Sequence, residues 1–104
     1  MLLKLGVDIS RLNREIRRAL NVIEKVYQAR GIEPVITSTY EGNHSAGSYH
    51  YANDAVDIRL IGDDDVVAEI LRRELITLKM HFGFKDNFLV LVEGSHIHIQ
   101  YTRM

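Results

Sequence analysis

The chain has 104 residues, a length typical of one small domain, so we expect residues 1–104 to form a single unit. Its formal net charge is -1, which excludes a global basic field and argues against a nucleic-acid partner. No apolar run approaches the roughly 20 residues that span a bilayer, and the apolar N-terminal stretch is too short for a signal peptide, so we expect neither a transmembrane segment nor a signal peptide.

The first predicted element is a helix over residues 8–30. Asp8 or Ser10 can cap its start, and Gly31 is suited to its end. Between these points apolar residues recur at three- and four-residue steps, as on one face of a helix: Leu12, Ile16, Ala19, Leu20, Ile23, Val26 and Tyr27.

Two strands are predicted next. Residues 34–40 are rich in β-branched side chains, and residues 55–60 alternate between apolar and polar side chains. The segment between them, residues 41–54, is polar and contains two glycines, which predicts a long loop. A loop of this length in a small domain often carries function.

A second helix is predicted from the acidic run at residues 63–65, where negative charge suits a helix N-terminus, to Gly83. Residues 88–92 and 96–101 then predict a hairpin of two strands around Glu93-Gly94-Ser95. The order of elements indicates an α+β domain, in which a small, mainly antiparallel sheet is covered by helices.

Four of the five histidines lie in two places along the chain. His44 and His50 fall in the long loop, and His96 and His98 fall on the last strand. Because side chains alternate along a strand, His96 and His98 share one face of the sheet. The chain has no cysteine, which excludes disulfides and thiolate ligands, so any metal must be bound by histidine and carboxylate side chains.

Asp57 stands between Val56 and Ile58, so alternation places it on the face away from the core. If the final hairpin pairs with this strand, Asp57 and His98 converge, and His50 lies at the entrance to the same strand. Two imidazole nitrogens and one carboxylate oxygen, with a fourth position open to water, are typical of catalytic zinc. The residues alone leave a second reading open, in which these are ordinary polar side chains without a metal.

These motifs resemble those of zinc D-alanyl-D-alanine (D-Ala-D-Ala) carboxypeptidases and phage L-alanyl-D-glutamate (L-Ala-D-Glu) endopeptidases. Lysostaphin-type enzymes and the Hedgehog signalling domain share that active-site layout. The resemblance is nearest to short phage and prophage members and covers nearly the whole chain. It is carried by Gly6-Val7-Asp8-Ile9, Val35-Ile36-Thr37-Ser38, Gly47-Ser48-Tyr49-His50 with Asp57 (H-x6-D), and Glu93 to His98 (E-x-x-H-x-H).

The resemblance implies a Hedgehog-like, D-Ala-D-Ala-peptidase-like fold with a zinc ion (Zn2+) bound by His50, Asp57 and His98. His96 and Glu93 are then the implied catalytic residues. His96 lies beside the metal and assists proton transfer or oxyanion stabilisation, and Glu93 is the rival general base. Relatives with E-x-x-H use the histidine as ligand and the glutamate as base, so an assignment of His96 as the third ligand stays open.

The resemblance further implies a hydrolase: a zinc metallopeptidase that degrades the bacterial cell wall. It would cleave the peptidoglycan stem peptide at a D-Ala-D-Ala or L-Ala-D-Glu bond with metal-activated water. It also implies a phage- or prophage-derived protein that is made in the cytoplasm. Many members carry an arginine just before the first zinc motif, whereas residues 39–44 contain neither Arg nor Lys. The alternative is therefore a non-catalytic zinc-binding domain of the same fold with a structural or binding role.

Overall fold

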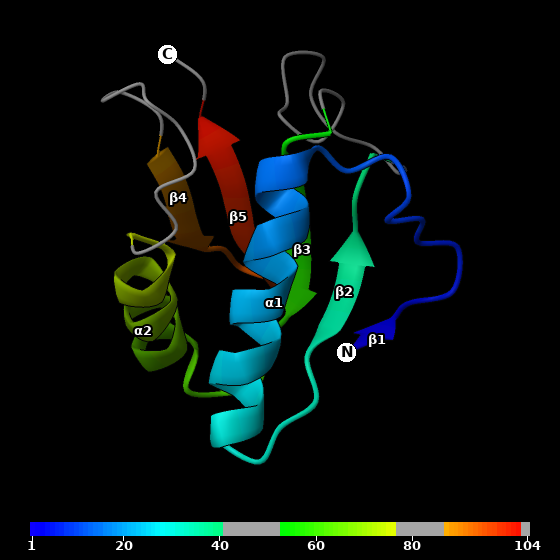
Figure 1. The fold of residues 1–104 in the computed structure, drawn as a ribbon. Helices are drawn as coiled ribbons and strands as arrows, with labels where there is room; N and C mark the ends of the chain where they lie inside the picture. The colour runs from blue at the N-terminus through cyan, green and yellow to red at the C-terminus, as the bar shows by residue number, and fades with distance from the viewer. Residues whose placement is uncertain (41–52, 77–86, 103–104) are drawn as a thin grey trace.

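A computed structural model of the protein describes residues 1–40, 53–76 and 87–102. These residues form one five-stranded sheet, in the order β1-β2-β3-β5-β4, and two helices that lie against one face of it (Figure 1). The elements in chain order are β1 Leu2–Leu3, α1 Arg14–Ala29, β2 Val35–Ser38, β3 Ala55–Arg59, α2 Asp64–Ile76, β4 Asn87–Val92 and β5 His96–Thr102. The predicted α+β class is confirmed.

The sheet is mixed, so the expectation of a mainly antiparallel sheet is wrong. β3 pairs antiparallel with β2 and β5, and β4 with β5, but β1 runs parallel to β2. The Leu2 N–H donates to the Pro34 carbonyl and the Lys4 N–H to the Ile36 carbonyl, both at 2.9 Å. A two-residue strand is too short to show a pattern in the sequence. It forms because the backbone groups of β2 at this edge of the sheet take hydrogen-bond partners.

The start of α1 also differs from the prediction, because the helix begins at Arg14 rather than at residue 8. The expected cap, Asp8, instead accepts a hydrogen bond on its carboxylate from the Ser10 N–H (2.8 Å) and on its carbonyl from the Thr39 hydroxyl (2.9 Å). These bonds hold the segment before α1 beside the end of β2. They stabilise a non-helical backbone around Asp8, so the helix does not begin there. Leu12 still reaches the core from this non-helical segment.

The end of α1 agrees with the prediction. Gly31 follows the helix with a φ of 71°, in the left-handed region that glycine adopts without steric cost. Its N–H donates to the Gln28 carbonyl (2.9 Å), and the Ile32 N–H donates to the Tyr27 carbonyl (3.0 Å). These bonds satisfy carbonyl groups that the last turn of a helix leaves unpaired.

The second helix begins where the acidic run predicted it. The Asp64 carboxylate accepts hydrogen bonds from the N–H groups of Ile61 and Gly62, at 2.8 and 3.0 Å. α2 is described as far as Ile76, and its predicted end at Gly83 lies outside the described residues. The bounds of β3, β4 and β5 lie within one residue of the predicted strands. The predicted hairpin is confirmed, since the Glu93 N–H donates to the carbonyl of His96 at 2.8 Å.

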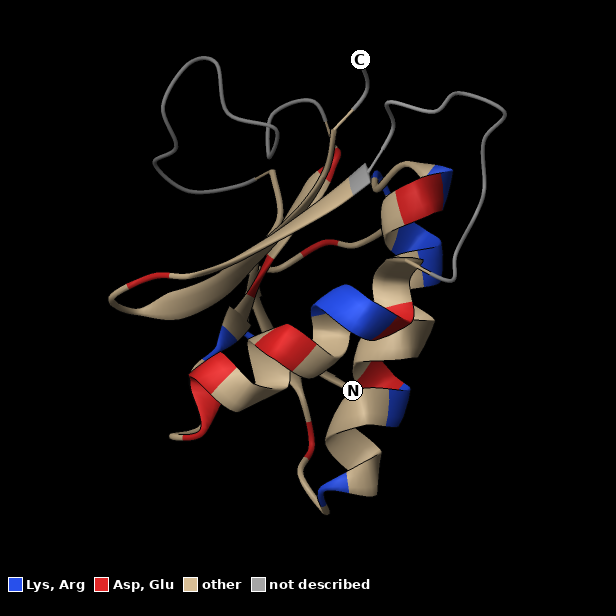
Figure 2. Cartoon of the chain, turned by 90° about the vertical axis from the view of Figure 1, so that its left-hand side faces the viewer, with Lys and Arg blue, Asp and Glu red and all other residues tan. Residues whose placement is uncertain are grey.

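The core lies between the sheet and the two helices. Its largest fully buried side chains come from both layers: Tyr27, Ile16, Ile23, Ile36, Ile58, Leu71, Leu75, Ile97, Ile99, Val56, Val67 and Val90. Acidic and basic residues are interspersed along both helices (Figure 2). Within the described ranges, no helix is long and apolar enough to cross a membrane.

Candidate metal centre

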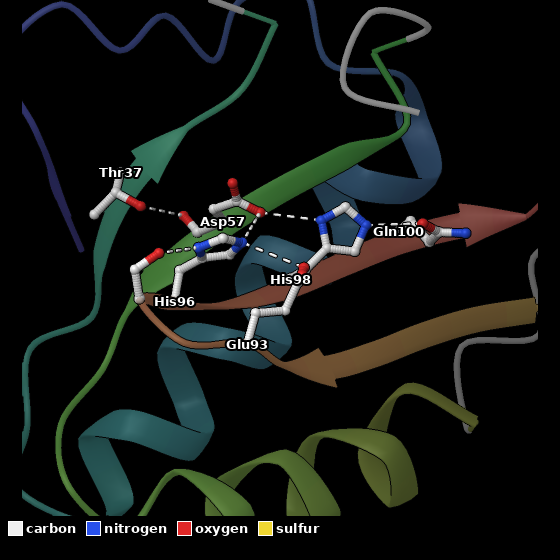
Figure 3. Close-up of polar contacts among 7 residues, drawn as sticks. Thr37, Asp57, Glu93, His96, His98 and Gln100 are labelled. Carbon is white, nitrogen blue, oxygen red and sulfur yellow. Dashed lines mark hydrogen bonds and ion pairs between the residues drawn. The ribbon is translucent and has the colours of Figure 1, made fainter. Parts of the chain in front are cut away.

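The pairing of β3 with β5 places Asp57 directly opposite His98. His96 lies two residues earlier on β5, so it projects from the same face of the sheet as His98. The sequence neighbours of these residues on the two strands fill the core on the opposite face: Val56, Ile58, Ile97 and Ile99. The side chains of Asp57, His96 and His98 therefore converge on the face that the helices do not cover, as Figure 3 shows.

Asp57 and His98 form the buried part of this cluster. Asp57 Oδ1 lies 3.0 Å from His98 Nδ1, and the two side chains are 8% and 11% exposed. Burial by itself lowers the pKa of His98, but hydrogen bonds to Asp57 and Gln100 favour the charged ring and leave its pKa above the ordinary value. The pair is thus a carboxylate and an imidazole held together with little solvent between them.

His96 and Glu93 form the accessible part of the cluster. His96 Nε2 lies 3.5 Å from Asp57 Oδ1 and 3.3 Å from Glu93 Oε1. The side chains of His96 and Glu93 are 25% and 47% exposed, so this side of the cluster meets solvent. The other ring nitrogen of His96, Nδ1, lies 2.8 Å from the Ser95 hydroxyl. Nε2 is therefore the nitrogen that His96 turns toward both carboxylates.

The donor atoms of this cluster lie close enough together that they could hold a metal ion. One ligand atom from each of Asp57, His96 and His98 lies within 4.8 Å of the other two. A tetrahedral zinc ion with bonds of about 2.1 Å holds its ligand atoms about 3.4 Å apart. The distances of 3.0 and 3.5 Å from Asp57 Oδ1 to the two imidazoles are close to that value. The group could hold a metal ion, and its nitrogen and oxygen donors suit zinc among other transition metals.

Two further side chains contact the cluster, and the sequence motifs assigned neither of them a role. Thr37 on β2 donates a hydrogen bond from Oγ1 to the backbone carbonyl of Asp57 at 3.3 Å. Ser95 contacts His96 as described above. A hydroxyl next to a histidine in a tight turn is a weak sequence signal for Ser95. For Thr37 the only signal is its place in the V-x-T-S segment.

The structure brings together four of the five predicted site residues: Asp57, His96, His98 and Glu93. The remaining one, His50, lies outside the described residues, as do His44, Ser48 and Tyr49. The predicted ligand set of His50, Asp57 and His98 therefore stays a prediction. The described geometry places His96 as close to the carboxylate as a ligand would be, so both assignments of the H-x-H pair are compatible with it.

Comparison with known proteins adds no family to this geometry. No model of a protein family matches the chain, and no curated protein matches its sequence.

Proposed function

We propose that the protein is a zinc-dependent peptidase that hydrolyses peptidoglycan stem peptides. One observation carries the proposal: Asp57, His96 and His98 converge from two paired strands, with the Glu93 carboxylate 3.3 Å from His96. A carboxylate and imidazoles next to a second, more exposed carboxylate are the groups that metal-assisted peptide hydrolysis needs. The H-x6-D and E-x-x-H-x-H motifs support the same assignment.

The distribution of solvent exposure favours catalysis over a purely structural zinc site. Structural zinc is normally closed by four protein ligands, whereas catalytic zinc keeps one position open. Here the Asp57 and His98 side chains are almost fully buried, while the His96 and Glu93 side chains are 25% and 47% exposed. A substrate can therefore approach the cluster from the side of the β4–β5 turn.

In this proposal Asp57, His98 and His50 hold the zinc ion. Zinc bound there supplies Lewis acidity, which polarises the scissile carbonyl and makes water more acidic. Glu93 or His96 takes the proton of the attacking water and delivers it to the leaving amine. The 3.3 Å contact between Glu93 Oε1 and His96 Nε2 allows the two groups to share that proton. Ser95 keeps the ring of His96 oriented for this exchange.

The proposed substrate class follows only from the resemblance. The stem peptide of bacterial peptidoglycan, cut at a D-Ala-D-Ala or L-Ala-D-Glu bond, is the target of the peptidases that the H-x6-D and E-x-x-H-x-H segments resemble. A phage- or prophage-derived protein acting on the cell wall is the matching biological role.

The test is mass spectrometry of purified peptidoglycan after incubation with zinc-loaded or chelator-treated protein. Release of D-alanine indicates a carboxypeptidase, and new termini at L-Ala and D-Glu indicate an endopeptidase. Either product should appear with the zinc-loaded protein and disappear after chelation. Intact stem peptides after incubation with protein that holds stoichiometric zinc would contradict the peptidase assignment.

A non-catalytic zinc domain is the second candidate, and one observation favours it. Residues 39–44 lack the arginine that many peptidases with these motifs carry before the first zinc motif. This candidate has a clear signature: zinc binds and stabilises the protein, and no peptide bond of peptidoglycan is cut.

Replacing the two histidines of the predicted loop tests which residue completes the site. His50→Ala should abolish stoichiometric zinc binding, whereas His44→Ala, a matched change in the same sequence segment, should retain it. Zinc content measured by atomic emission shows which of the two variants retains the metal. If His50→Ala retains zinc while His96→Ala loses it, the metal is bound by Asp57, His96 and His98 instead.

A further inference from the structure

We propose that Gln100, oriented by Thr102, is a positioning residue that makes His98 present Nδ1 rather than Nε2 to the metal. The inference rests on the metal site of the proposed function and is independent of peptide cleavage. Its basis is a row of three polar side chains on β5, His98, Gln100 and Thr102. They stand at alternate positions and therefore share the face of the sheet that carries the metal centre.

Hydrogen bonds connect the three side chains of this row. Gln100 Nε2 donates to Thr102 Oγ1 at 3.2 Å, and Gln100 Oε1 lies 2.8 Å from His98 Nε2. On the other side of the ring, His98 Nδ1 lies 3.0 Å from Asp57 Oδ1. Figure 3 shows the imidazole of His98 between Asp57 and Gln100, with one ring nitrogen toward each.

The chemistry of the amide fixes the proton on the ring. A glutamine amide has an oxygen that only accepts hydrogen bonds and a nitrogen that only donates them. The Gln100 nitrogen donates to Thr102 and the Gln100 oxygen faces His98, so Nε2 of His98 carries the proton that this contact needs. In the metal-free protein Nδ1 donates its own proton to the Asp57 carboxylate. A metal bound between the two groups would replace that proton, and the neutral ring, still protonated on Nε2, would offer the lone pair of Nδ1.

The two histidines therefore offer different ring nitrogens to a metal. His98 has its Nε2 held by Gln100 and offers Nδ1, whereas His96 has its Nδ1 beside Ser95 and offers Nε2. A ligand ring whose second nitrogen donates to a fixed acceptor is held in one tautomer and one orientation, and it binds metal more tightly for that reason.

The first test needs no substitution. In zinc-loaded protein with 15N-labelled histidine, long-range proton–nitrogen spectra assign each ring nitrogen as protonated or metal-bound. We expect His98 to carry its proton on Nε2 and to bind zinc through Nδ1. A spectrum with the metal on Nε2 of His98 would overturn the inference.

The second test measures zinc affinity by titration calorimetry. Gln100→Leu should weaken zinc binding by about ten- to a hundredfold, the usual cost of losing a partner of a ligand imidazole. Gln100→Glu should restore binding, because a carboxylate accepts from Nε2 and the Thr102 hydroxyl can donate to it. Thr102→Val should weaken binding less, and Thr102→Ser should bind as the wild type does. Gln28→Leu is the matched control, since the Gln28 side chain is exposed and its one described hydrogen bond is to Glu24 on the same helix.

The outcomes separate this inference from the proposed function. Zinc affinity that Gln100→Leu leaves unchanged, in a variant whose metal-free melting temperature matches the wild type, overturns the positioning role alone. Wild-type protein that binds no zinc overturns the metal site and the positioning role together. Wild-type protein that binds zinc with the expected ring assignment but cleaves no peptide supports the positioning role and contradicts the peptidase.

Discussion

At the scale of single residues, the Asp57 carboxylate links the two histidines of the cluster. It lies within 3.5 Å of a ring nitrogen of each, although its side chain is only 8% exposed. Burying a carboxylate is costly unless hydrogen bonds or opposite charge compensate it. His98 supplies that compensation in the metal-free protein, and a bound cation would supply more.

Replacement of this carboxylate should therefore abolish the site. Asp57→Ala should lose stoichiometric zinc and all peptidase activity, as measured by atomic emission and by peptidoglycan digestion. It should also destabilise the metal-free protein by about 1–3 kcal/mol, because His98 Nδ1 is left buried without its partner. Asp65→Ala, on the exposed start of α2, is the control and should change none of these three properties. Stoichiometric zinc in the Asp57→Ala protein would contradict the ligand assignment.

Asp54 is a second buried acid, and it joins the start of α1 to the start of β3. Its Oδ1 accepts a hydrogen bond from Asn13 Nδ2 at 2.7 Å, and its carbonyl accepts one from the Tyr101 N–H at 2.8 Å. Burial raises the pKa of Asp54 above 3.8, and the bond from Asn13 only partly opposes this. Ionisation of Asp54 therefore costs more in the folded protein than in the unfolded chain.

This shift predicts how stability depends on pH. The stabilising contribution of protonated Asp54 is fully present below pH 3.8, the unfolded value, and is lost as the pH rises through the folded pKa. Asp54→Asn cannot ionise. The free energy of unfolding of this variant should therefore rise relative to that of the wild type as the pH increases through this range. Urea unfolding of both proteins at a series of pH values measures the difference. A difference that does not vary with pH would contradict the prediction, and Asp65→Asn is the exposed control.

At the scale of elements, α2 protects the edge of the sheet next to the site. The Arg72 guanidinium donates to the Val90 carbonyl from Nε (3.2 Å) and from its terminal nitrogen (2.7 Å). Val90 lies on β4, the strand at the sheet edge, where an unpaired carbonyl invites association with another chain. The contact joins α2 to the hairpin that carries His96 and His98.

Removal of this contact should weaken the hairpin. Arg72→Ala should lower the free energy of unfolding by about 1.5–3 kcal/mol, the range for hydrogen bonds to a charged group. Arg73→Ala is a matched control one residue away, since the Arg73 side chain is 75% exposed and pairs with Glu69. Its effect should stay within about 0.5 kcal/mol. Urea denaturation compares the two, and equal effects would contradict a specific role for Arg72.

At the scale of the whole molecule, the metal centre joins segments far apart in the sequence. Asp57 lies on β3, the central strand of the sheet, and the two histidines lie on β5, the last strand in the sequence. A metal bound to both strands stabilises the folded state, which assembles the site, over the unfolded chain, which does not.

Zinc should therefore raise the melting temperature of the wild type, and a chelator should reverse the change. At free zinc about one hundred times the dissociation constant, the gain in stability is about 2.7 kcal/mol. Differential scanning fluorimetry over a zinc series measures it. The Asp57→Ala protein should show no shift. A shift of equal size in that variant would show that zinc acts elsewhere on the molecule.

The sequence by itself determined the local features of this protein. Alternation along residues 55–59 and 96–101 predicted that Asp57, His96 and His98 face away from the core, and the glycine after Arg30 predicted the end of α1. These predictions succeeded because each depends on the burial or backbone angles of neighbouring residues, which a short stretch of sequence records. The predicted roles of His50 and of the individual catalytic groups remain untested.

Only the tertiary structure decided how these pieces meet. The register that sets Asp57 opposite His98, the parallel pairing of β1, and the start of α1 at Arg14 depend on residues distant in the sequence. The hydrogen bond from His98 to Gln100 lies within one strand, as does the bond from Gln100 to Thr102, but the other ring nitrogen of His98 contacts Asp57 on the neighbouring strand β3. Such features are set by the packing of the common core and by backbone groups that need partners, and neither quantity can be read from a local pattern.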